Sequence, residues 1–373
     1  MLLSLLPILT TSLTLSSDIA ALADFKSSIT NPRQFSCLFK WNFTASDPCE
    51  FPCGISCTTR STTNLYSRIT AITLDPAGYS GRLPASFANL TALEHLDLSG
   101  NAFYGRIPRS LFTLPSLKTL VLASNSFAGS IPKLVAKSSS LQKLDLSRNL
   151  LTGTVPQSLG SLSSLTTVDL SYNRLTGSIP GSLLPNLVEL ALRGNSINGF
   201  LKQSAFSPLQ SIQVIELAGN RLEGKLESWL FLLPSMQQMD LSNNSFTGLS
   251  VQSPPVNGTN QFVAIDLGFN HIKGTLPVQL AQFGSLVSVS LRHNLLTGHV
   301  PAEYCTAKEG VGFRRLFLDG NFLNGEVPKG FFENENFVGS FGDNCLEGCP
   351  SSMVICSPAQ KPQSVCMKQQ HTA

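Results

Sequence analysis

A short sequence unit that recurs about every 24 residues, as between Asn125, Asn149 and Asn173, constrains the fold of this chain more than any other feature. One copy runs from Leu144 to Pro156 and reads Leu-Asp-Leu-Ser-Arg-Asn-Leu-Leu-Thr-Gly-Thr-Val-Pro. A fixed period of this length is typical of solenoids, in which each coil contacts only its neighbours, so a length of 373 residues sets no domain count. The asparagine position of the unit is held in turn by eleven residues, which predicts about eleven coils: Ala77, Asn101, Asn125, Asn149, Asn173, Asn195, Asn220, Asn244, Asn270, Asn294 and Asn321.

Each part of the unit has its own physical role. Leu144-Asp145-Leu146 alternates as a strand does, with the leucines directed into the core and the aspartate outward, and the strands of successive coils would form a parallel sheet. Asn149 lies where the chain turns inward, and its amide can bond backbone groups of its own coil and of neighbouring coils. Gly153 permits a backbone that a Cβ would obstruct, and Pro156 fixes φ. A leucine at every third position then suits a short 3₁₀ return path on the convex side: Leu159, Leu162 and Leu165.

The N-terminal segment predicts a secretory signal peptide over residues 1–17. It is almost uncharged and rich in leucine, it is too short to span a bilayer, and Ser16 and Ser17 follow it, so we expect cleavage near Ser17. After it, residues 18–29 predict an amphipathic helix with Ser17 as N-cap and one apolar face: Ile19, Leu22, Phe25 and Ile29. Together with the cysteine-containing loop after it, this helix would cover the open end of the first coil over residues 18–68.

The nine cysteines lie mainly at the two ends of the chain. Four precede the repeats (Cys37, Cys49, Cys53 and Cys57) and four follow them (Cys345, Cys349, Cys356 and Cys366), while Cys305 stands alone. This placement predicts two disulfide-bonded caps in an oxidising compartment, with three possible connectivities in each cap. A zinc site is not favoured, because the spacing lacks paired Cys-x-x-Cys geometry and no histidine completes a set. Four N-glycosylation sequons agree with secretion: Asn42, Asn89, Asn243 and Asn257.

The domain organisation follows from these features. We expect a signal peptide over residues 1–17, an N-terminal cap over 18–68, leucine-rich repeats over 69–340 and a C-terminal cap and tail over 341–373. Cys305 is expected either to be buried as a free thiol or to form an intermolecular link.

Composition and motifs exclude several classes of function. The net charge of +3 and the absence of a basic run give no indication of nucleic-acid binding. No run of 18 apolar residues follows the N-terminal segment, so no transmembrane helix is expected. The five histidines show no metal-ligand spacing and no nucleophile motif is present, so we expect no enzyme activity, no metal and no cofactor.

Acidic residues recur at the outward position between the two strand leucines. They are Asp97, Asp145, Asp169, Glu216, Asp240 and Asp266, interrupted by Val121 and Ala191. Stacked about 4.8 Å apart, they would form an acidic column on the concave sheet. The column is either a docking strip for a basic partner or a consequence of a repeat that habitually carries aspartate there.

Other outward positions become basic and aromatic toward the C-terminal half. Arginine can grip a carboxylate with two hydrogen bonds and aromatic rings supply contact area, so this composition suits a peptide or a protein loop. The alternative is that these are unrelated surface residues. The ligand-binding residues predicted on the concave face are therefore Asp97, Asp145, Asp169, Tyr172, Arg193, Phe269, Arg292, His293, Arg314, Arg315 and Phe317.

The segment from Leu165 to Pro180 resembles the plant extracellular leucine-rich repeat, and Ala20–Lys26, Trp41-Asn42 and Asp47-Pro48-Cys49 resemble the N-terminal cap of plant leucine-rich-repeat receptors and receptor-like proteins. The resemblance implies an α/β solenoid. It would be a right-handed superhelix with a parallel concave sheet, a 3₁₀ or irregular convex side and disulfide caps. In the N-terminal cap it implies the pairs Cys49–Cys57 and Cys37–Cys53.

The function that this resemblance implies is recognition. We expect a secreted, non-enzymatic, receptor-like protein of the apoplast or cell wall that binds a peptide or protein on its concave face in signalling or defence, with a receptor kinase as a further partner. Similarity to polygalacturonase-inhibiting proteins leaves a second hypothesis, the inhibition of a pathogen glycosidase. A third hypothesis is a structural wall component or co-receptor.

Overall fold

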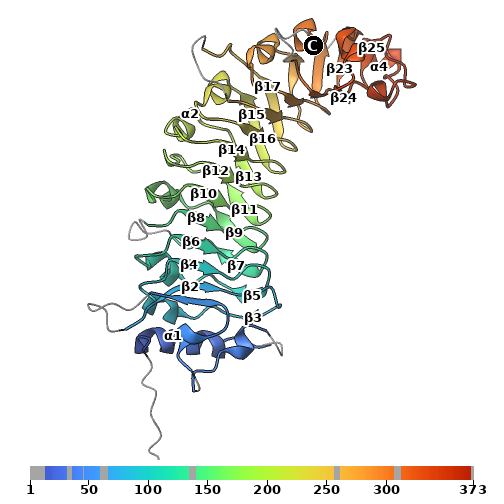
Figure 1. Ribbon diagram of the computed structural model, residues 1–373. Coiled ribbons are helices and arrows are strands. Elements are labelled where there is room, and N and C mark those ends of the chain that lie inside the picture. Colours follow the sequence, from blue (N-terminus) through green and yellow to red (C-terminus); the bar gives the residue numbers. More distant parts are fainter. Residues whose placement is uncertain are drawn as a thin grey trace, which may run out of the picture. The chain divides into compact units, whose positions relative to one another are not determined.

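A computed structural model of the protein describes residues 13–31, 36–44, 46–58, 66–133, 140–255, 261–305 and 312–370 (Figure 1). The chain divides into two compact units, residues 1–152 and residues 153–373, which we describe in turn. Both have the same architecture, a first parallel sheet and a second parallel sheet joined by short 3₁₀ helices. This confirms the predicted leucine-rich-repeat solenoid with a parallel sheet.

The first unit begins with the cap. It comprises α1 (Ser16–Ser27), η1 (Leu38–Lys40), η2 (Pro48–Glu50) and β1 (Ile55–Cys57), and β1 pairs antiparallel with β2 (Ile69–Thr73). The parallel first sheet then continues from β2 through β4 (His95–Asp97), β6 (Thr119–Val121) and β8 (Lys143–Asp145). The second sheet holds β3 (Ser80–Gly81), β5 (Ala102–Gly105), β7 (Ser126–Ser130) and β9 (Leu150–Thr154), and the described 3₁₀ helices of these coils are η3 (Ala85–Asn89) and η4 (Arg109–Thr113).

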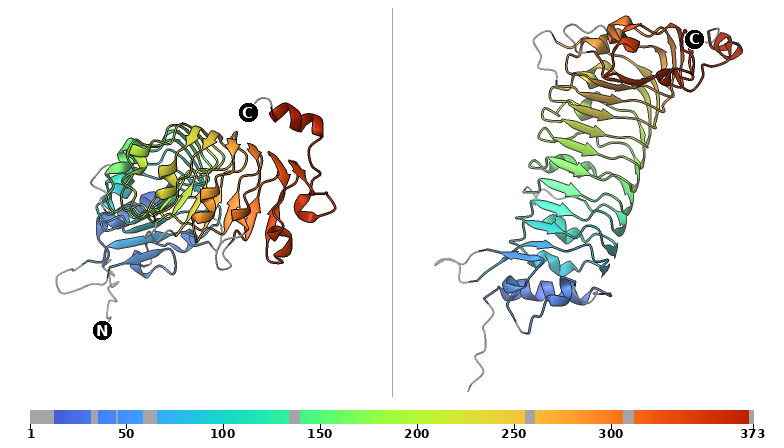
Figure 2. Two further views of the ribbon diagram at one scale, coloured as in Figure 1. Left: turned by 90° about the horizontal axis from the view of Figure 1, so that it is seen from above. Right: turned by 45° about the vertical axis from the view of Figure 1, so that its right-hand side comes forward.

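The second unit repeats the arrangement over more coils, with its strands side by side (green to red in Figure 2). Its first sheet runs through β10 (Thr167–Asp169), β12 (Glu189–Ala191), β14 (Val214–Glu216), β16 (Gln238–Asp240), β18 (Ala264–Asp266), β20 (Ser288–Ser290), β22 (Arg315–Phe317) and β24 (Val338–Ser340). Its second sheet runs through β11 (Arg174–Gly177), β13 (Ser196–Gly199), β15 (Arg221–Leu226), β17 (Ser245–Leu249), β19 (Lys273–Thr275), β21 (Leu295–Gly298), β23 (Phe322–Glu326) and β25 (Cys345–Glu347).

Short helices connect the strands of the second unit. The described ones are η6 (Gln157–Ser161), α2 (Gln203–Phe206), η7 (Ser228–Leu232), η8 (Val278–Gln282), η9 (Ala302–Tyr304) and α3 (Gly330–Glu333), and two further helices follow the last strand, η11 (Val354–Cys356) and α4 (Gln363–Gln370). The 3₁₀ helix η6 starts directly after Pro156, as the leucine spacing predicts, and Leu159 in it is buried. Within the part of the chain that the structure describes, no helix has the length and apolar character needed to cross a membrane.

A ladder of asparagine side chains holds neighbouring coils together. The Nδ2 of Asn149 donates to the carbonyls of Leu122, Leu146 and Ser147 at 2.9, 3.2 and 3.0 Å, and its Oδ1 accepts from the Phe127 N–H at 2.9 Å. One amide thus satisfies backbone groups of two successive coils, which would otherwise be buried without partners. The prediction from the sequence ends at Asn321, but Asn344 makes the same bonds, to the carbonyls of Leu318, Phe341 and Gly342 and from the Leu323 N–H.

The N-terminal cap differs from the prediction at its start. The helix covers Ser16–Ser27 rather than residues 18–29, and the residue before it, Leu15, gives no side-chain cap, so the assignment of Ser17 as N-cap is wrong. Asp18 in the first turn is fully buried instead. Its carboxylate accepts from Arg68 Nε and Nη2 at 3.0 and 3.1 Å and from the Ile69 N–H at 3.0 Å. The helix therefore starts where Asp18 can join the first coil to the cap.

Residues just before the helix also belong to the cap. The backbone N–H groups of Leu13 and Thr14 donate to Asp47 Oδ2 at 2.6 and 2.8 Å, and the Thr14 hydroxyl donates to Asp47 Oδ1. A mature chain that retains residues 13–17 would keep these contacts, which cleavage near Ser17 would remove. The rest of the predicted signal peptide, residues 1–12, lies outside the described residues.

Disulfides close both ends of the described chain. The N-terminal pairs are Cys37–Cys53 and Cys49–Cys57, which confirms the pairing that the family resemblance implies. The C-terminal pairs, which the sequence left open, are Cys345–Cys366 and Cys349–Cys356. Cys305 is a half-buried free thiol whose Sγ donates to the Ala302 carbonyl at 3.1 Å, and burial raises its pKa.

We expect Asn294→Ala to lower the free energy of unfolding by about 3 kcal/mol, because it orphans the carbonyls of Leu267 and Leu291 and the Ile272 N–H in the core. Urea denaturation followed by circular dichroism measures the loss. The matched control is Asn198→Ala, at an exposed position of the second sheet, which should change stability by less than about 0.5 kcal/mol. Equal losses in the two variants would contradict the role of the ladder.

We expect Arg68→Ala to destabilise the N-terminal cap by about 3 kcal/mol, because it leaves the Asp18 carboxylate buried without its cation. Hydrogen exchange of the amides in α1 should accelerate accordingly. The control Arg109→Ala removes an exposed arginine that forms no ion pair with any described residue, and it should leave the exchange of α1 unchanged. Unaltered exchange in the Arg68 variant would show that the pair does not hold the cap.

Candidate ligand-binding face

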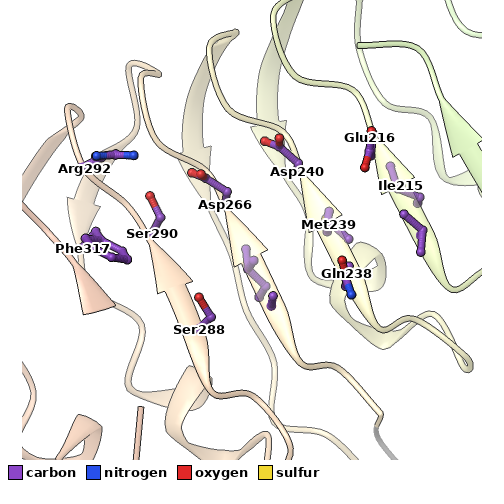
Figure 3. Close-up of a pocket in the computed structure, with 13 residues that line it drawn as sticks. Ile215, Glu216, Gln238, Met239, Asp240, Asp266, Ser288, Ser290, Arg292 and Phe317 are labelled. Atoms are coloured by element: carbon purple, nitrogen blue, oxygen red, sulfur yellow. The ribbon is translucent and has the colours of Figure 1, made fainter. Parts of the chain in front are cut away.

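One pocket lies on the outer face of the first sheet of the second unit, across strands β14 to β22 (Figure 3). We call it the sheet pocket. Its lining residues are Val214, Ile215, Glu216, Gln238, Met239, Asp240, Ala264, Ile265, Asp266, Ser288, Ser290, Arg292 and Phe317. The strand register places Glu216, Asp240, Asp266, Ser290 and Phe317 in one row of outward positions on five successive strands.

The acidic end of the sheet pocket is formed by Glu216, Asp240 and Asp266 (Figure 3). The carboxylates of Asp240 and Asp266 accept from the backbone N–H two residues later, Ser242 at 3.0 Å and Gly268 at 2.8 Å. One oxygen of each therefore stabilises the turn that follows the strand.

The same contact recurs outside the sheet pocket. Asp97 and Asp145 in the first unit, and Asp169 in the second, accept from the backbone N–H two residues on, at 2.9, 3.0 and 2.8 Å. This supports the interpretation that the repeat habitually carries aspartate at this position to cap the turn. Within the described residues, no group of three or more His, Cys, Asp and Glu side chains is arranged to hold a metal ion.

The carboxylates at the acidic end of the sheet pocket repel one another. Burial and the neighbouring Asp240 carboxylate raise the pKa of Glu216, while Arg193 acts in the opposite direction. Arg193 Nη1 forms an ion pair with Asp240 Oδ2 at 3.0 Å. One arginine thus offsets only part of the charge of three neighbouring carboxylates.

The other end of the sheet pocket is basic and aromatic. The guanidinium of Arg292 lies between two rings, with Cζ 5.5 Å from the Phe269 centroid and 5.6 Å from the Phe317 centroid. The His293 ring stacks on Phe269 at 4.5 Å, and its Nε2 lies 3.4 Å from Asp319 Oδ2. Cation–π contacts restrict the positions that the flexible arginine side chain can take.

Two polar atoms at this end lack partners. Arg292 Nε and Ser290 Oγ are buried, and neither makes a hydrogen bond to any described residue. Ser290 is 6% exposed, and no described acid forms an ion pair with Arg292. Buried polar groups without partners are uncommon and cost free energy, and Ser110 Oγ, Ser171 Oγ and Asn324 Oδ1 share this state elsewhere in the described chain.

The turn beside the sheet pocket has a left-handed residue. The residue before each ladder asparagine from Asn101 to Asn344 has a positive φ, and glycine occupies that position at Gly100, Gly194, Gly219 and Gly320. Phe269 and His293 adopt the same conformation with φ of 56° and 50°. A left-handed residue other than glycine costs roughly 1–2 kcal/mol. Because Ser124, Arg148, Tyr172, Asn243 and Asp343 adopt the same conformation at this position, it belongs to the repeat and does not by itself mark the site.

The structure gathers some of the predicted site residues and separates others. Arg292 and Phe317 line the sheet pocket. The Phe269 ring lies beside the Arg292 guanidinium, the His293 ring stacks on Phe269, and Arg193 forms an ion pair with Asp240. Arg314 and Arg315 are exposed at the start of β22, Asp169 and Tyr172 belong to β10 and the turn after it, and Asp97 and Asp145 belong to the first unit. The site list from the sequence omits Ser290 and Gln238, and it also omits Glu216, Asp240 and Asp266, which were predicted only as members of the acidic column. The sequence contains one signal for Ser290, because this serine stands where neighbouring coils carry aspartate.

The predicted glycosylation sites take different places. Asn42, Asn89 and Asn243 are exposed, and Asn243 occupies the left-handed position that corresponds to Phe269. Asn257 lies outside the described residues.

Known sequence families match much of the chain. The leucine-rich-repeat model matches residues 115–175, 139–197 and 185–246, a second leucine-rich-repeat model matches 92–114, and the leucine-rich-repeat N-terminal domain matches 15–58. Receptor-like protein 7 of Arabidopsis thaliana is 31% identical over 150 residues, which are 38% of this chain and 14% of that protein.

Solved structures share the fold. The PEPR1–AtPEP1 structure superposes with a TM-score of 0.72 at 27% identity and covers 89% of this chain, which spans 49% of that chain. A plant ice-binding protein superposes with a TM-score of 0.66 at 28% identity and covers 78% of this chain and 90% of its own. The same fold thus occurs in proteins with different functions, so the function of this chain has to be argued from its site.

We expect Glu216→Gln to flatten the pH dependence of stability. A carboxyl group whose pKa is raised on folding destabilises the native state as pH rises from its usual pKa through the raised value. Below the usual pKa of about 4.3, the wild type and the variant should be equally stable, whereas at neutral pH the variant should be the more stable. Denaturation midpoints at several pH values measure this. A variant that is less stable at neutral pH would contradict the strain at Glu216.

Proposed function

Since this chain is a leucine-rich-repeat protein of the plant receptor-like ectodomain type, we propose that it binds an extended peptide segment in the sheet pocket of its second unit. The single observation that carries the proposal is the Arg292 guanidinium, which lies over the Phe269 and Phe317 rings in the sheet pocket and forms no hydrogen bond or ion pair with any described residue.

The dimensions of the sheet pocket favour a peptide over a small molecule. It extends over the five strands β14, β16, β18, β20 and β22. Parallel strands lie about 4.8 Å apart, so the four intervals span roughly 19 Å. An extended peptide rises about 3.3 Å per residue, and about six residues would therefore lie along the pocket.

The chemistry of the lining also favours a peptide. Gln238 on β16 and Ser288 and Ser290 on β20 offer hydrogen-bond donors and acceptors on either side of β18, which suits the amides of a peptide backbone. Phe269 and Phe317 supply apolar contact area beside the arginine, and aromatic and arginine side chains dominate the free energy of protein interfaces.

The comparisons support this proposal in general terms. The ectodomain of the receptor kinase GASSHO1/SCHENGEN3 was solved in complex with CASPARIAN STRIP INTEGRITY FACTOR 2, and the Arabidopsis receptor kinase HAESA in complex with the peptide hormone IDA and the co-receptor SERK1. We extend from these proteins to this chain a peptide ligand, an extracellular location in the apoplast or cell wall, a role in signalling or defence and a receptor kinase as co-receptor. Four disulfides agree with an oxidising, extracellular location.

We expect Phe269→Gly to separate binding from stability. Glycine relieves the left-handed backbone by about 1 kcal/mol, which offsets the lost stacking on His293, so the denaturation midpoint should stay within a few degrees of the wild type. Arg292→Gln should weaken peptide binding by about tenfold or more, because it removes the charged donor. The control Arg174→Gln changes an exposed arginine of the second sheet and should have no effect.

The measurement is the capture of peptides from plant extracellular fluid on the immobilised, secreted protein, followed by mass spectrometry. Wild type and the Arg174 variant should retain the same peptides, and the Phe269 and Arg292 variants should lose them. Equal retention by all four proteins would overturn the assignment of the site. Inhibition of a fungal polygalacturonase by the wild type, with no captured peptide, would instead support the inhibitor hypothesis.

A further inference from the structure

Resting on the proposed function, we propose that the sheet pocket selects a dipolar peptide segment. A lysine or arginine side chain of the ligand would lie over Glu216, Asp240 and Asp266, and a ligand carboxylate would bind at Arg292 and Ser290. The two ligand groups are separated by two or four residues in an extended chain.

The acidic end has negative charge that the described residues leave unbalanced. Glu216, Asp240 and Asp266 stand on adjacent strands, in one row (Figure 3). Arg193 forms an ion pair with Asp240, and no described cation forms an ion pair with Glu216 or Asp266. A cationic side chain placed over this row would reduce the mutual repulsion of the three carboxylates.

The arginine end has unfilled donor capacity. Arg292 Cζ lies over the rings of Phe269 and Phe317, and the residue is half-buried, so its Nη groups, unlike the enclosed Nε, can meet a ligand. A carboxylate matches these groups because it can accept two parallel N–H bonds. The Ser290 hydroxyl, 94% buried and without a described partner, would supply a further donor in the same pocket.

Gly268 brings the two ends close together. A Cβ at this position would lie 3.1 Å from Arg292 Cγ, 3.1 Å from Asp266 Oδ1 and 3.2 Å from Ser290 Oγ. Its absence lets the carboxylate, the hydroxyl and the arginine stem share one small space. Asp266 and Arg292 nevertheless form no ion pair, so both charges stay available to a ligand.

The strand spacing sets the separation of the two ligand charges. From the strand of Ser290, Asp266 is one strand away and Glu216 is three strands away, which corresponds to about 5 Å and about 14 Å. Side chains on one face of an extended peptide lie two or four residues apart, at about 6.6 and 13 Å. Odd separations would direct one of the two side chains away from the sheet.

The test is a random peptide library displayed on phage and selected on the immobilised, secreted protein. Sequences enriched by the wild type should carry Lys or Arg two or four residues from Asp, Glu or the peptide C-terminus. With Arg292→Gln, the enriched peptides should lose the acidic group but keep the basic residue. The triple change Glu216→Gln, Asp240→Asn and Asp266→Asn should abolish the enrichment of the basic residue alone, while the Asn side chains still accept from the turn N–H groups.

The outcomes separate this inference from the proposed function. Enriched sequences without a charge pattern, or with a pattern that both variants leave intact, would overturn the dipolar ligand and leave peptide binding supported. The absence of any enriched sequence would overturn both. For one selected peptide, replacing either charged residue with glutamine should weaken binding by about tenfold.

Discussion

The fold depends on how each coil satisfies the backbone where the chain turns into its core. The asparagine amide is suited to this, because it has donors and an acceptor on one planar group. Asn149 bonds three carbonyls and one N–H at about 3 Å, spread over its own coil and the preceding one. A polar group that would be costly to bury alone becomes the link between coils, and the leucines can then be fully enclosed.

The same turn also creates a place where side chains are not dictated by the fold. Hydrogen bonds between coils hold the residue before the asparagine in a left-handed conformation, as for Phe269 N–H to the Arg292 carbonyl at 2.9 Å and His293 N–H to the Asp319 carbonyl at 2.7 Å. Glycine meets this requirement at the lowest cost. Other residues nevertheless occupy it elsewhere, such as Ser124, Arg148 and Asn243. What distinguishes Phe269 and His293 is that their rings stack on each other beside Arg292.

The sequence predicted what repetition and chemistry determine. The coil period, the outward row and the disulfide-bonded ends follow from leucine spacing, asparagine and cysteine, and the structure confirms them. It did not predict the start of α1, because the burial of Asp18 against Arg68 depends on residues far apart in the sequence. It also missed the coil of Asn344, because Phe341 and Gly342 stand where the repeat normally shows leucine and a polar residue.

For the site, the strand register predicted which side chains face outward, but not what each of them does. Asp240 and Asp266 each bond the turn after the strand through Oδ1, so the presence of an aspartate in this row does not by itself indicate a ligand. The informative positions are those whose side chains the fold of the coil does not require. Ser290 and Phe317 replace the aspartate on the next two strands, and Gly268 leaves space beside them. The row changes from acidic to neutral and aromatic side chains beside Arg292. The fold of the coil does not require this change in charge along the sheet, and a ligand with a matching distribution of charge is its simplest physical explanation.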